Sequence, residues 1–553
     1  MGRESPDEEQ THEEVRERDL VEAYLGEHAL EQSLNDVINQ VVADRPEDPF
    51  LVLSRLLYAK ATSQKGIFYV QVQEILDARG QPTVLVQLHT GKGVFDATVS
   101  GCTGGLPDKL PVIEDQPMLP LTKQRHGGKG YRKRADKAQN ALNDKLAGME
   151  PTEQSVIDSI LLALEPEVGR NICVATSVAV CKAGAKYAEL PLHEYIAKLL
   201  EMPTENMCIP MPMFSIINGG KLASNKMFIQ EVTIAPSSAL TFADALQIGA
   251  EFTNLVKEQL DTRGLGFSNS GAFGGFTPQV QVLSEVFLFL RGAYDEIRSR
   301  YDGAAHGMTK GSVSPLRIEF GLDVSADEFL APVVAAAPTP EGGDEADTRT
   351  TFSYNTDKWV QGSSGVAKSS EEMLDMIRGN VRELEITSVV DPFARGDVKT
   401  HTALYIAEHD QDTLGTVDTD GSEGGGRKVV GGDPNCKLQI VSRKLHELHG
   451  LENVLQERAC NTIALQLEQH PSLTRALEAV LDARRLGVAI ILSAQSGGIT
   501  DGNFLASFAV GAGIGQVKFG GLASAECVER YNQLLLIADD ELAPGFVNAS
   551  YRR

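Results

Sequence analysis

The spacing of apolar residues changes along the chain, and each change predicts a different kind of element. The first apolar run repeats every three or four residues, the period of a helix with one buried face. Its members are Leu20, Tyr24, Leu30, Leu34, Val37, Ile38 and Val41. Arg45-Pro46-Glu47-Asp48-Pro49 then ends the helix, because proline lacks an amide donor and fixes φ. A second apolar helix follows from Phe50, so the pattern predicts a helical pair over residues 19–62.

From Gly66 the period becomes two, which indicates strands with one buried face. The alternating positions are Phe68, Val70, Val72, Val84, Val86, Leu88, Val94, Ala97 and Val99. Turn residues at Arg79-Gly80-Gln81-Pro82 and Thr90-Gly91-Lys92-Gly93 separate three runs, which predicts an antiparallel meander. Helical sequence follows to about residue 200. We therefore predict an α+β domain over residues 66–205.

Beyond Cys208 short apolar strands alternate with helices, an order that is typical of a parallel α/β barrel. The predicted strands are Ile229–Val232, Leu316–Val324, Ile386–Val390, Leu438–Val441, Thr462–Leu467, Ala489–Leu492 and Gln516–Phe519. This part of the chain is expected to form one domain over residues 206–545. The predicted fold class is α/β, with a barrel, an α+β domain before it and a short helical domain at the start.

Composition narrows the choice of partners. A net charge of −25 argues against a nucleic-acid surface, which requires a basic face. The segment 1–18 is rich in acidic residues, which is unlike a targeting peptide, and it is expected to be disordered. No apolar stretch of the chain is long enough to span a bilayer. Seven scattered cysteines suit a reducing compartment, so a cytoplasmic or cytoskeletal location is expected.

One basic run interrupts this acidic chain. Residues 123–137 contain Lys123, Arg125, Lys129, Arg132, Lys133, Arg134 and Lys137. The run can be read as a solvated helix face with a basic loop, or as a docking patch for an acidic partner.

Several motifs in the second and third regions resemble those of enolases, and they occur in the enolase order. They are Glu74-Ile75-Leu76-Asp77-Ala78-Arg79-Gly80-Gln81-Pro82-Thr83, Ile217-Asn218-Gly219-Gly220, Gln230-Glu231, Gly321-Leu322-Asp323 and Gly515-Gln516-Val517-Lys518. The resemblance implies an enolase-type TIM-like barrel behind an α+β cap domain. It also implies a family reaction, 2-phosphoglycerate to phosphoenolpyruvate, that needs a lysine base and Mg²⁺.

The metal ligands implied by this resemblance are mostly replaced. Asp323 is kept, but Val390 stands where the family has a glutamate. Arg443 and Lys444 stand at the third carboxylate position. Magnesium prefers hard oxygen ligands, so we expect an ion pair at Asp323 in place of a metal, and no bound cofactor.

The acid and base groups are replaced as well. Gln466 stands in place of the lysine base and Phe273 in place of the catalytic glutamate. Leu222 and Ala494 stand in place of two histidines. The surviving residues are Gln230, Glu231, Ser496 and Lys518. They are either a remnant of catalysis or a buried Glu231/Asp323–Lys518 network kept because loss of one charge would strand the others.

The N-terminal helical pair resembles a second family, the dimerisation/docking domains of the DPY-30 and type II kinase-regulatory-subunit group. The positions that carry this likeness are Tyr24, Leu25, Leu30, Leu34, Val37, Ile38, Pro46, Pro49 and Phe50. Such domains form dimeric four-helix bundles that bind an amphipathic helix of a partner. An ordinary helical hairpin packed on its own protein is the alternative.

These resemblances lead to three hypotheses. The first is a catalytically inactive enolase-like scaffold, a homodimer that binds a protein partner through residues 19–62. By resemblance to enolase-like proteins of cilia and sperm tails, that partner would be axonemal. The second is an active or weakly active enolase, and the third is a sensor that binds a phosphorylated metabolite through Lys518, Arg443 and Lys444.

Overall fold

The computed structural model describes most of the chain in segments. They are residues 66–100, 120, 123–266, 268–303, 315–331, 352–360, 362, 365, 367–409, 438–494, 501–547 and 551–552, with parts of 21–57. The tail 1–18 and Ser496 lie outside the described residues, so the expectations for them stay predictions.

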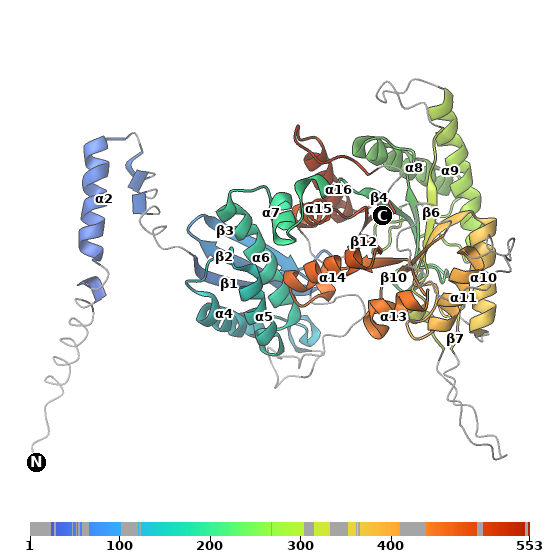
Figure 1. Cartoon of the computed structure of the whole chain (residues 1–553), viewed down its shortest axis with the longest axis horizontal. Helices are drawn as coiled ribbons and strands as arrows, with labels where there is room; N and C mark the ends of the chain where they lie inside the picture. The colour runs from blue at the N-terminus through green and yellow to red at the C-terminus, as the bar shows by residue number, and fades with distance from the viewer. Residues whose placement is uncertain are drawn as a thin grey trace, which may run out of the picture.

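The alternating segment forms the predicted antiparallel meander β1–β2–β3. The strands are β1 (Ile67–Leu76), β2 (Pro82–Thr90) and β3 (Gly93–Val99). One face of this sheet is covered by helices, as Figure 1 shows. They are α4 (Arg132–Leu146) and α6 (Arg170–Ala188), and α5 (Gln154–Val168) and α7 (Leu192–Leu199) pack against α6. Because helix α6 is buried almost all round, it forms the centre of this domain.

The remainder of the chain forms the predicted α/β barrel, which is closed in the order β10-β11-β12-β13-β4-β5-β6-β9. Its strands are β4 (Met211–Asn218), β5 (Glu231–Ala235), β6 (Glu319–Asp323), β9 (Ile386–Val390), β10 (Gln439–Ser442), β11 (Thr462–Leu465), β12 (Ala489–Ser493) and β13 (Gln516–Gly520). A separate two-stranded sheet pairs β7 (Ser353–Tyr354) with β8 (Lys368–Ser369). The eight barrel strands place their carboxyl ends around a common rim, apart from the one reversed strand described below.

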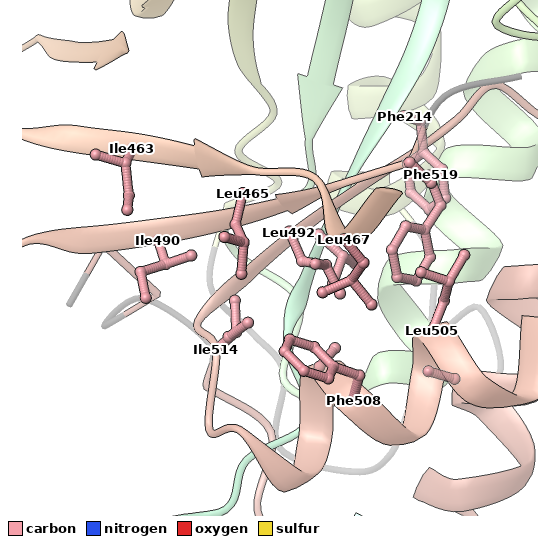
Figure 2. Packing of buried hydrophobic residues seen from close by; sticks show 14 of the residues in the cluster. Phe214, Ile463, Leu465, Leu467, Ile490, Leu492, Leu505, Phe508, Ile514 and Phe519 are labelled. Carbon is pink, nitrogen blue, oxygen red and sulfur yellow. The ribbon is translucent and has the colours of Figure 1, made fainter. Parts of the chain in front are cut away.

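Helices surround the barrel. They are α8 (Phe242–Thr262), α9 (Leu283–Gly303), α10 (Ser370–Glu383), α11 (Val398–His409), α12 (Leu445–His449), α13 (Leu451–Gln456), α14 (Leu473–Arg485), α15 (Gly502–Gly511) and α16 (Ala525–Ala538). Figure 2 shows how α15 closes one side: Leu505 and Phe508 lie among side chains of the barrel strands, including Leu492 and Phe519. This apolar layer fixes β11, β12 and β13, the strands that carry part of the rim.

The prediction of an all-parallel barrel is wrong at one strand. Strand β5 runs antiparallel to both β4 and β6. No α-helix lies between β4 and β5, whereas α8 and α9 both lie between β5 and β6. A connection without a crossover helix returns the chain beside β4 in the opposite direction. Strand β4 itself was absent from the predicted strands.

Buried polar contacts join the cap domain to the barrel. Asp158 of α5 accepts hydrogen bonds from the Thr474 amide (2.8 Å) and hydroxyl (2.6 Å) at the start of α14. Ser177 of α6 donates to Asp158 (2.6 Å) and accepts from the Leu473 amide (2.9 Å). A carboxylate and a hydroxyl of one domain thus satisfy two free amides at a helix start in the other.

The N-terminal helical prediction agrees with the structure in helix α2 (Leu30–Asp44), which ends at Arg45. Figure 1 shows α2 apart from the cap domain and the barrel. The predicted apolar stripe divides into two parts. Val37 (2% exposed) and Val41 are buried, whereas Tyr24, Leu25, Leu34, Ile38 (46%) and Phe50 (80%) are exposed. The helix therefore presents apolar side chains to solvent.

Candidate functional site

The carboxyl ends of the parallel barrel strands, with the amino end of the reversed strand β5, bring together most residues that the sequence singled out. Strand pairing places Glu231 opposite Asp323, Asp323 opposite Val390, and Val390 opposite Val441. Arg443 follows β10 directly. On the other side, Lys518 of β13 pairs with Ser493 of β12. One rim therefore holds Glu231, Asp323, Val390, Arg443 and Lys518.

Asp323 is the most heavily bound carboxylate of this rim. Its Oδ2 accepts from Arg443 Nη2 at 2.5 Å and from Lys518 Nζ at 2.6 Å. Its Oδ1 accepts from Ser325 Oγ at 2.9 Å. Burial alone would raise the pKa of Asp323, but the charges of Arg443 and Lys518 outweigh burial and lower it well below the ordinary value. Asp323 is therefore a buried, ionised partner of two cations.

Lys518 joins a second carboxylate to the same cluster. Its Nζ donates to Glu231 Oε1 at 2.5 Å, and both side chains are buried. Burial would lower the pKa of Lys518, but the charges of Asp323 and Glu231 raise it above its ordinary value. Burial raises the pKa of Glu231, and its Oε2 has no hydrogen-bond partner among the described residues. Lys518 thus remains charged at neutral pH.

Asp391 is a third buried carboxyl that the sequence argument missed. It accepts from the Arg443 amide at 2.8 Å, and its Oδ2 lies 3.6 Å from Arg443 Nε. Its backbone adopts a left-handed conformation (φ 42°), which a non-glycine residue holds only when its surroundings fix it. Burial raises the pKa of Asp391. The only sequence signal was its position, directly after the predicted strand ending at Val390.

Of the two cations at the third metal position, only Arg443 contacts Asp323. Lys444 Nζ points to Glu328, at 3.8 Å from its Oε1, and Lys221 Nζ lies 3.1 Å from Oε2 of the same glutamate. Glu328 is only half-buried, in contrast to the fully buried Asp323.

The positions that the resemblance assigns to the base and to the catalytic glutamate hold Gln466 and Phe273. Gln466 is buried directly after β11 and accepts a hydrogen bond from the Gln469 side chain. Phe273 is buried, with its ring centre 6.0 Å from Lys518 Nζ. A glutamine amide does not accept a proton at neutral pH, and a phenyl ring has none to give.

The remaining predicted positions lie around this cluster. Gln230 is buried next to Glu231, and its backbone amide donates to the backbone carbonyl of Asp323 at 2.8 Å. Leu222 ends a short 3-10 turn (Gly220–Leu222). The Ala494 amide donates to the Lys518 carbonyl at 3.0 Å. Neither alanine nor leucine can transfer a proton or make a side-chain hydrogen bond, as a histidine would.

The rim residues do not fit a magnesium ion. Both oxygens of Asp323 are bound by protein groups, and Val390 offers no oxygen. Within the described part of the chain, no group of three or more His, Cys, Asp or Glu side chains is arranged to hold a metal. Arg443 instead brings a positive charge to the first carboxylate, so an ion pair occupies the position.

A small cavity lies inside the barrel against this cluster. Its volume is about 10 Å³, and its lining includes Asp323, Ser388, Val390, Arg443 and Lys518. This is at the lower limit for one water molecule. The cavity therefore has no room for a metabolite.

Two histidines of the short helix α12, which follows β10, make contacts within the barrel domain. His446 is partly buried and shares a 2.9 Å hydrogen bond between its Nδ1 and Ser442 Oγ, and burial lowers its pKa to about 4. His449 Nε2 lies 3.0 Å from the Arg395 carbonyl. Both histidines are therefore partly buried and make hydrogen bonds within the protein.

A closed α/β barrel with a reversed second strand, behind an α+β domain, defines the class of protein as enolase-like. The family description of the enolase N-terminal domain matches residues 67–196. That of the enolase C-terminal TIM barrel domain matches residues 206–421 and 426–551. Because these matches span most of the chain, the protein belongs to the enolase family.

Two plant proteins illustrate the relationship. The chain is 30% identical over 528 residues to cytosolic enolase 3 of Arabidopsis thaliana, covering 94% of this chain and 96% of that protein. It is 28% identical over 501 residues to an enolase of Solanum lycopersicum, covering 88% of this chain and 98% of that protein. Residues 67–553 are about 88% of the chain, so the Arabidopsis match must extend into the first 66 residues. Among the described helices, none has the length and apolar character to cross a membrane.

Proposed function

We propose that this chain is a catalytically inactive member of the enolase family that works as a structural scaffold through its N-terminal helices. The observation that carries the loss of activity is the Arg443–Asp323 ion pair, 2.5 Å long and buried at the position of the metal. A guanidinium at this position repels Mg²⁺. It also binds Asp323, the one carboxylate that is kept from the metal ligands implied by the resemblance.

The base position supports the same proposal. Removal of a positioned base alone slows catalysis by about two to four orders of magnitude. Here Gln466 replaces the base, while Val390 and Arg443 replace two metal ligands. The base and the metal ligands would act together in removing the substrate proton. Because all three are replaced, no measurable turnover is expected.

A weakly active enzyme would need Lys518 as a substitute base. A base must be neutral to accept a proton, but Lys518 contacts Glu231 and Asp323, which raise its pKa. The sensor hypothesis needs free positive charge at the rim. Lys518 and Arg443 are already paired with carboxylates and buried, so neither is available to a phosphate. Lys444, the third cation of that hypothesis, lies 3.8 Å from Glu328 and is 13% exposed.

The scaffold role is supported by the exposed part of the α2 stripe. Leu34 and Ile38 lie one helical turn apart and both are exposed, which is the arrangement of a helix that associates with another. Exposed apolar positions of this kind fit a homodimer that binds an amphipathic helix of a protein partner. An axonemal partner in a cilium or flagellum follows only from the resemblance to enolase-like proteins of those organelles.

The activity proposal is tested by a coupled assay of 2-phosphoglycerate dehydration with saturating Mg²⁺. The wild-type chain and a Gln466→Lys variant are compared with an active enolase in the same buffer. We expect turnover only from the active enolase, because Gln466→Lys leaves the Arg443–Asp323 pair in place. Mg²⁺-dependent turnover by the wild type that disappears in Lys518→Ala would overturn the proposal.

The scaffold proposal has a separate test in ciliated cells. The tagged full-length chain is compared with a version that lacks residues 19–62. We expect axonemal localisation of the first and a diffuse signal from the second. Equal localisation of both would show that these helices do not dock the protein.

A further inference from the structure

A cationic patch surrounds the first turn of α4. It consists of Lys123, Arg125, Lys129, Arg132, Lys133, Arg134 and Lys137. Residues 123–137 contain one acid, Asp136, although the whole chain has a net charge of −25. All members except Arg134 are exposed. The patch is therefore an isolated positive surface on an acidic protein.

Acidic neighbours neutralise only part of this patch. Glu74 of β1 lies 2.5 Å from Arg125, and Glu167 of α5 lies 3.3 Å from Lys137. The charged groups of Lys123, Lys129 and Arg132 make no ion pair within the described part of the chain. Positive charge therefore remains at the surface.

The backbone holds these cations together against their repulsion. Glu74 Oε2 accepts from the Tyr131 amide at 2.5 Å, and His126 and Gly127 make a left-handed turn before the helix. Helix α4 has no acidic residue in its first turn, and the side chain of its N-cap residue Tyr131 makes no capping hydrogen bond, so Glu74 from β1 is the acid at its start. Cations at a helix start are unfavourable because the helix dipole is positive there. An anionic segment bound to the patch would reduce the repulsion among the cations. It would also place negative charge at the positive end of the helix dipole.

We propose that the acidic N-terminal segment, residues 4–19 of the same chain, binds the cationic patch. The acidic residues of this segment are Glu4, Asp7, Glu8, Glu9, Glu13, Glu14, Glu17 and Asp19. A separate acidic protein would be repelled by the net charge of −25, whereas a tethered segment is already present at high effective concentration.

The course of the chain allows this contact. The N-terminal region leads into β1 at Ile67, and the Glu74 that anchors the patch lies further along the same strand. Seven residues of strand span about 23 Å. The helical residues between 21 and 57 and the segment after them are long enough to cover this distance.

The experiment is zero-length carbodiimide crosslinking of the full chain, which joins a carboxylate to a lysine amine only when they touch. Peptides are identified by mass spectrometry. At low salt we expect crosslinks between residues 4–19 and Lys123 or Lys129. At 1 M salt, where the Debye length falls to about 3 Å, we expect at least a fivefold loss of these crosslinks.

Charge variants make the test specific. Lys123→Glu/Lys129→Glu removes the crosslinking lysines and should abolish these crosslinks, whereas Lys198→Glu/Lys399→Glu, with the same change in net charge at two exposed sites elsewhere, should not reduce them. Adding Glu8→Lys/Glu9→Lys/Glu13→Lys to the patch variant should restore crosslinks with the charges exchanged. Circular dichroism of every variant checks that it is folded.

Isotope labelling separates the sources of the contact. In a mixture of ¹⁴N and ¹⁵N chains, crosslinks confined to one label support binding within the chain. Crosslinks that join the two labels, crosslinks that survive high salt, no crosslinks to residues 4–19, or no rescue by the exchanged charges would each overturn the proposal.

Discussion

The Arg443 guanidinium lies 2.5 Å from Asp323 Oδ2, although the two residues are 120 positions apart in the chain. They meet because β6 and β10 both pair with β9, which carries Val390 between them. The carboxylate that the resemblance assigns to the metal is here the partner of a cation. The same oxygen accepts from Lys518, so Asp323 connects the whole buried cluster.

Loss of Arg443 should destabilise the barrel strongly. Removal of one partner from a buried pair leaves an uncompensated charge and costs about 3–5 kcal/mol. We expect Arg443→Ala to lower the free energy of unfolding by about this amount in urea denaturation. Arg485→Ala is the matched control. The Arg485 side chain is 65% exposed, and such surface pairs contribute at most about 1 kcal/mol. An equal decrease in the free energy of unfolding in the two variants would show that the buried Arg443–Asp323 pair stabilises the fold no more than a surface pair does.

The raised pKa of Glu231 predicts a specific pH dependence. A carboxyl with a raised pKa in the folded state binds more protons folded than unfolded. It therefore stabilises the fold at low pH and contributes less as pH rises from its ordinary pKa of 4.5 through the raised value. Glu231→Gln removes this dependence. We expect the stability of the wild type relative to Glu231→Gln to fall as pH rises from 4 to 7.

Urea denaturation at several pH values within that range measures this difference. Glu452→Gln, at an exposed glutamate, should show no comparable trend. A wild type that gains stability over Glu231→Gln with rising pH would contradict the raised pKa.

Metal binding should return when the two replaced carboxylates are restored together. Val390→Glu/Arg443→Asp removes the competing guanidinium and places two carboxylates beside Asp323. We expect Mg²⁺ to raise the melting temperature of this variant. A ligand at a hundred times its Kd stabilises a fold by about 2.7 kcal/mol. The wild type and Val390→Glu alone should not respond, because Arg443 still binds Asp323. A Mg²⁺-dependent shift of the wild type would show that the rim holds a metal after all.

The rim positions could be predicted from the sequence because each lies beside a motif that marks the end of a barrel strand. Gly321-Leu322-Asp323 ends an apolar strand, and residues at strand ends of a barrel converge on one rim. Lys518 was already a candidate partner of Asp323, and the second cation could be narrowed only to Arg443 or Lys444. The choice depended on which side chain turns inward after β10, and that is set by tertiary packing.

Other features left no mark in the sequence pattern. A period of two identifies a strand but not its direction, so the reversal of β5 could not be predicted. Asp391 acts through a left-handed backbone and a hydrogen bond from the Arg443 amide, both of which depend on the closed barrel. The apolar stripe of α2 was predicted, but helical periodicity alone does not show which part of it is buried.

The division of that stripe gives a last prediction. Leu34→Asp/Ile38→Asp places charges on the exposed side without touching Val37 or Val41. If this side forms the proposed dimer, the variant should be monomeric at concentrations where the chain that carries only the control change is dimeric. The control is Asn39→Asp, an exposed polar position on the same helix, which adds one negative charge where the double variant adds two.

Sedimentation velocity over a range of protein concentrations measures the outcome. Circular dichroism should show that the helical content of both variants is unchanged. Because charged groups at the centre of an apolar interface are desolvated without partners, we expect the dimer Kd to rise at least a hundredfold, about 2.7 kcal/mol. A double variant that remains as dimeric as Asn39→Asp would place the association surface elsewhere on the chain.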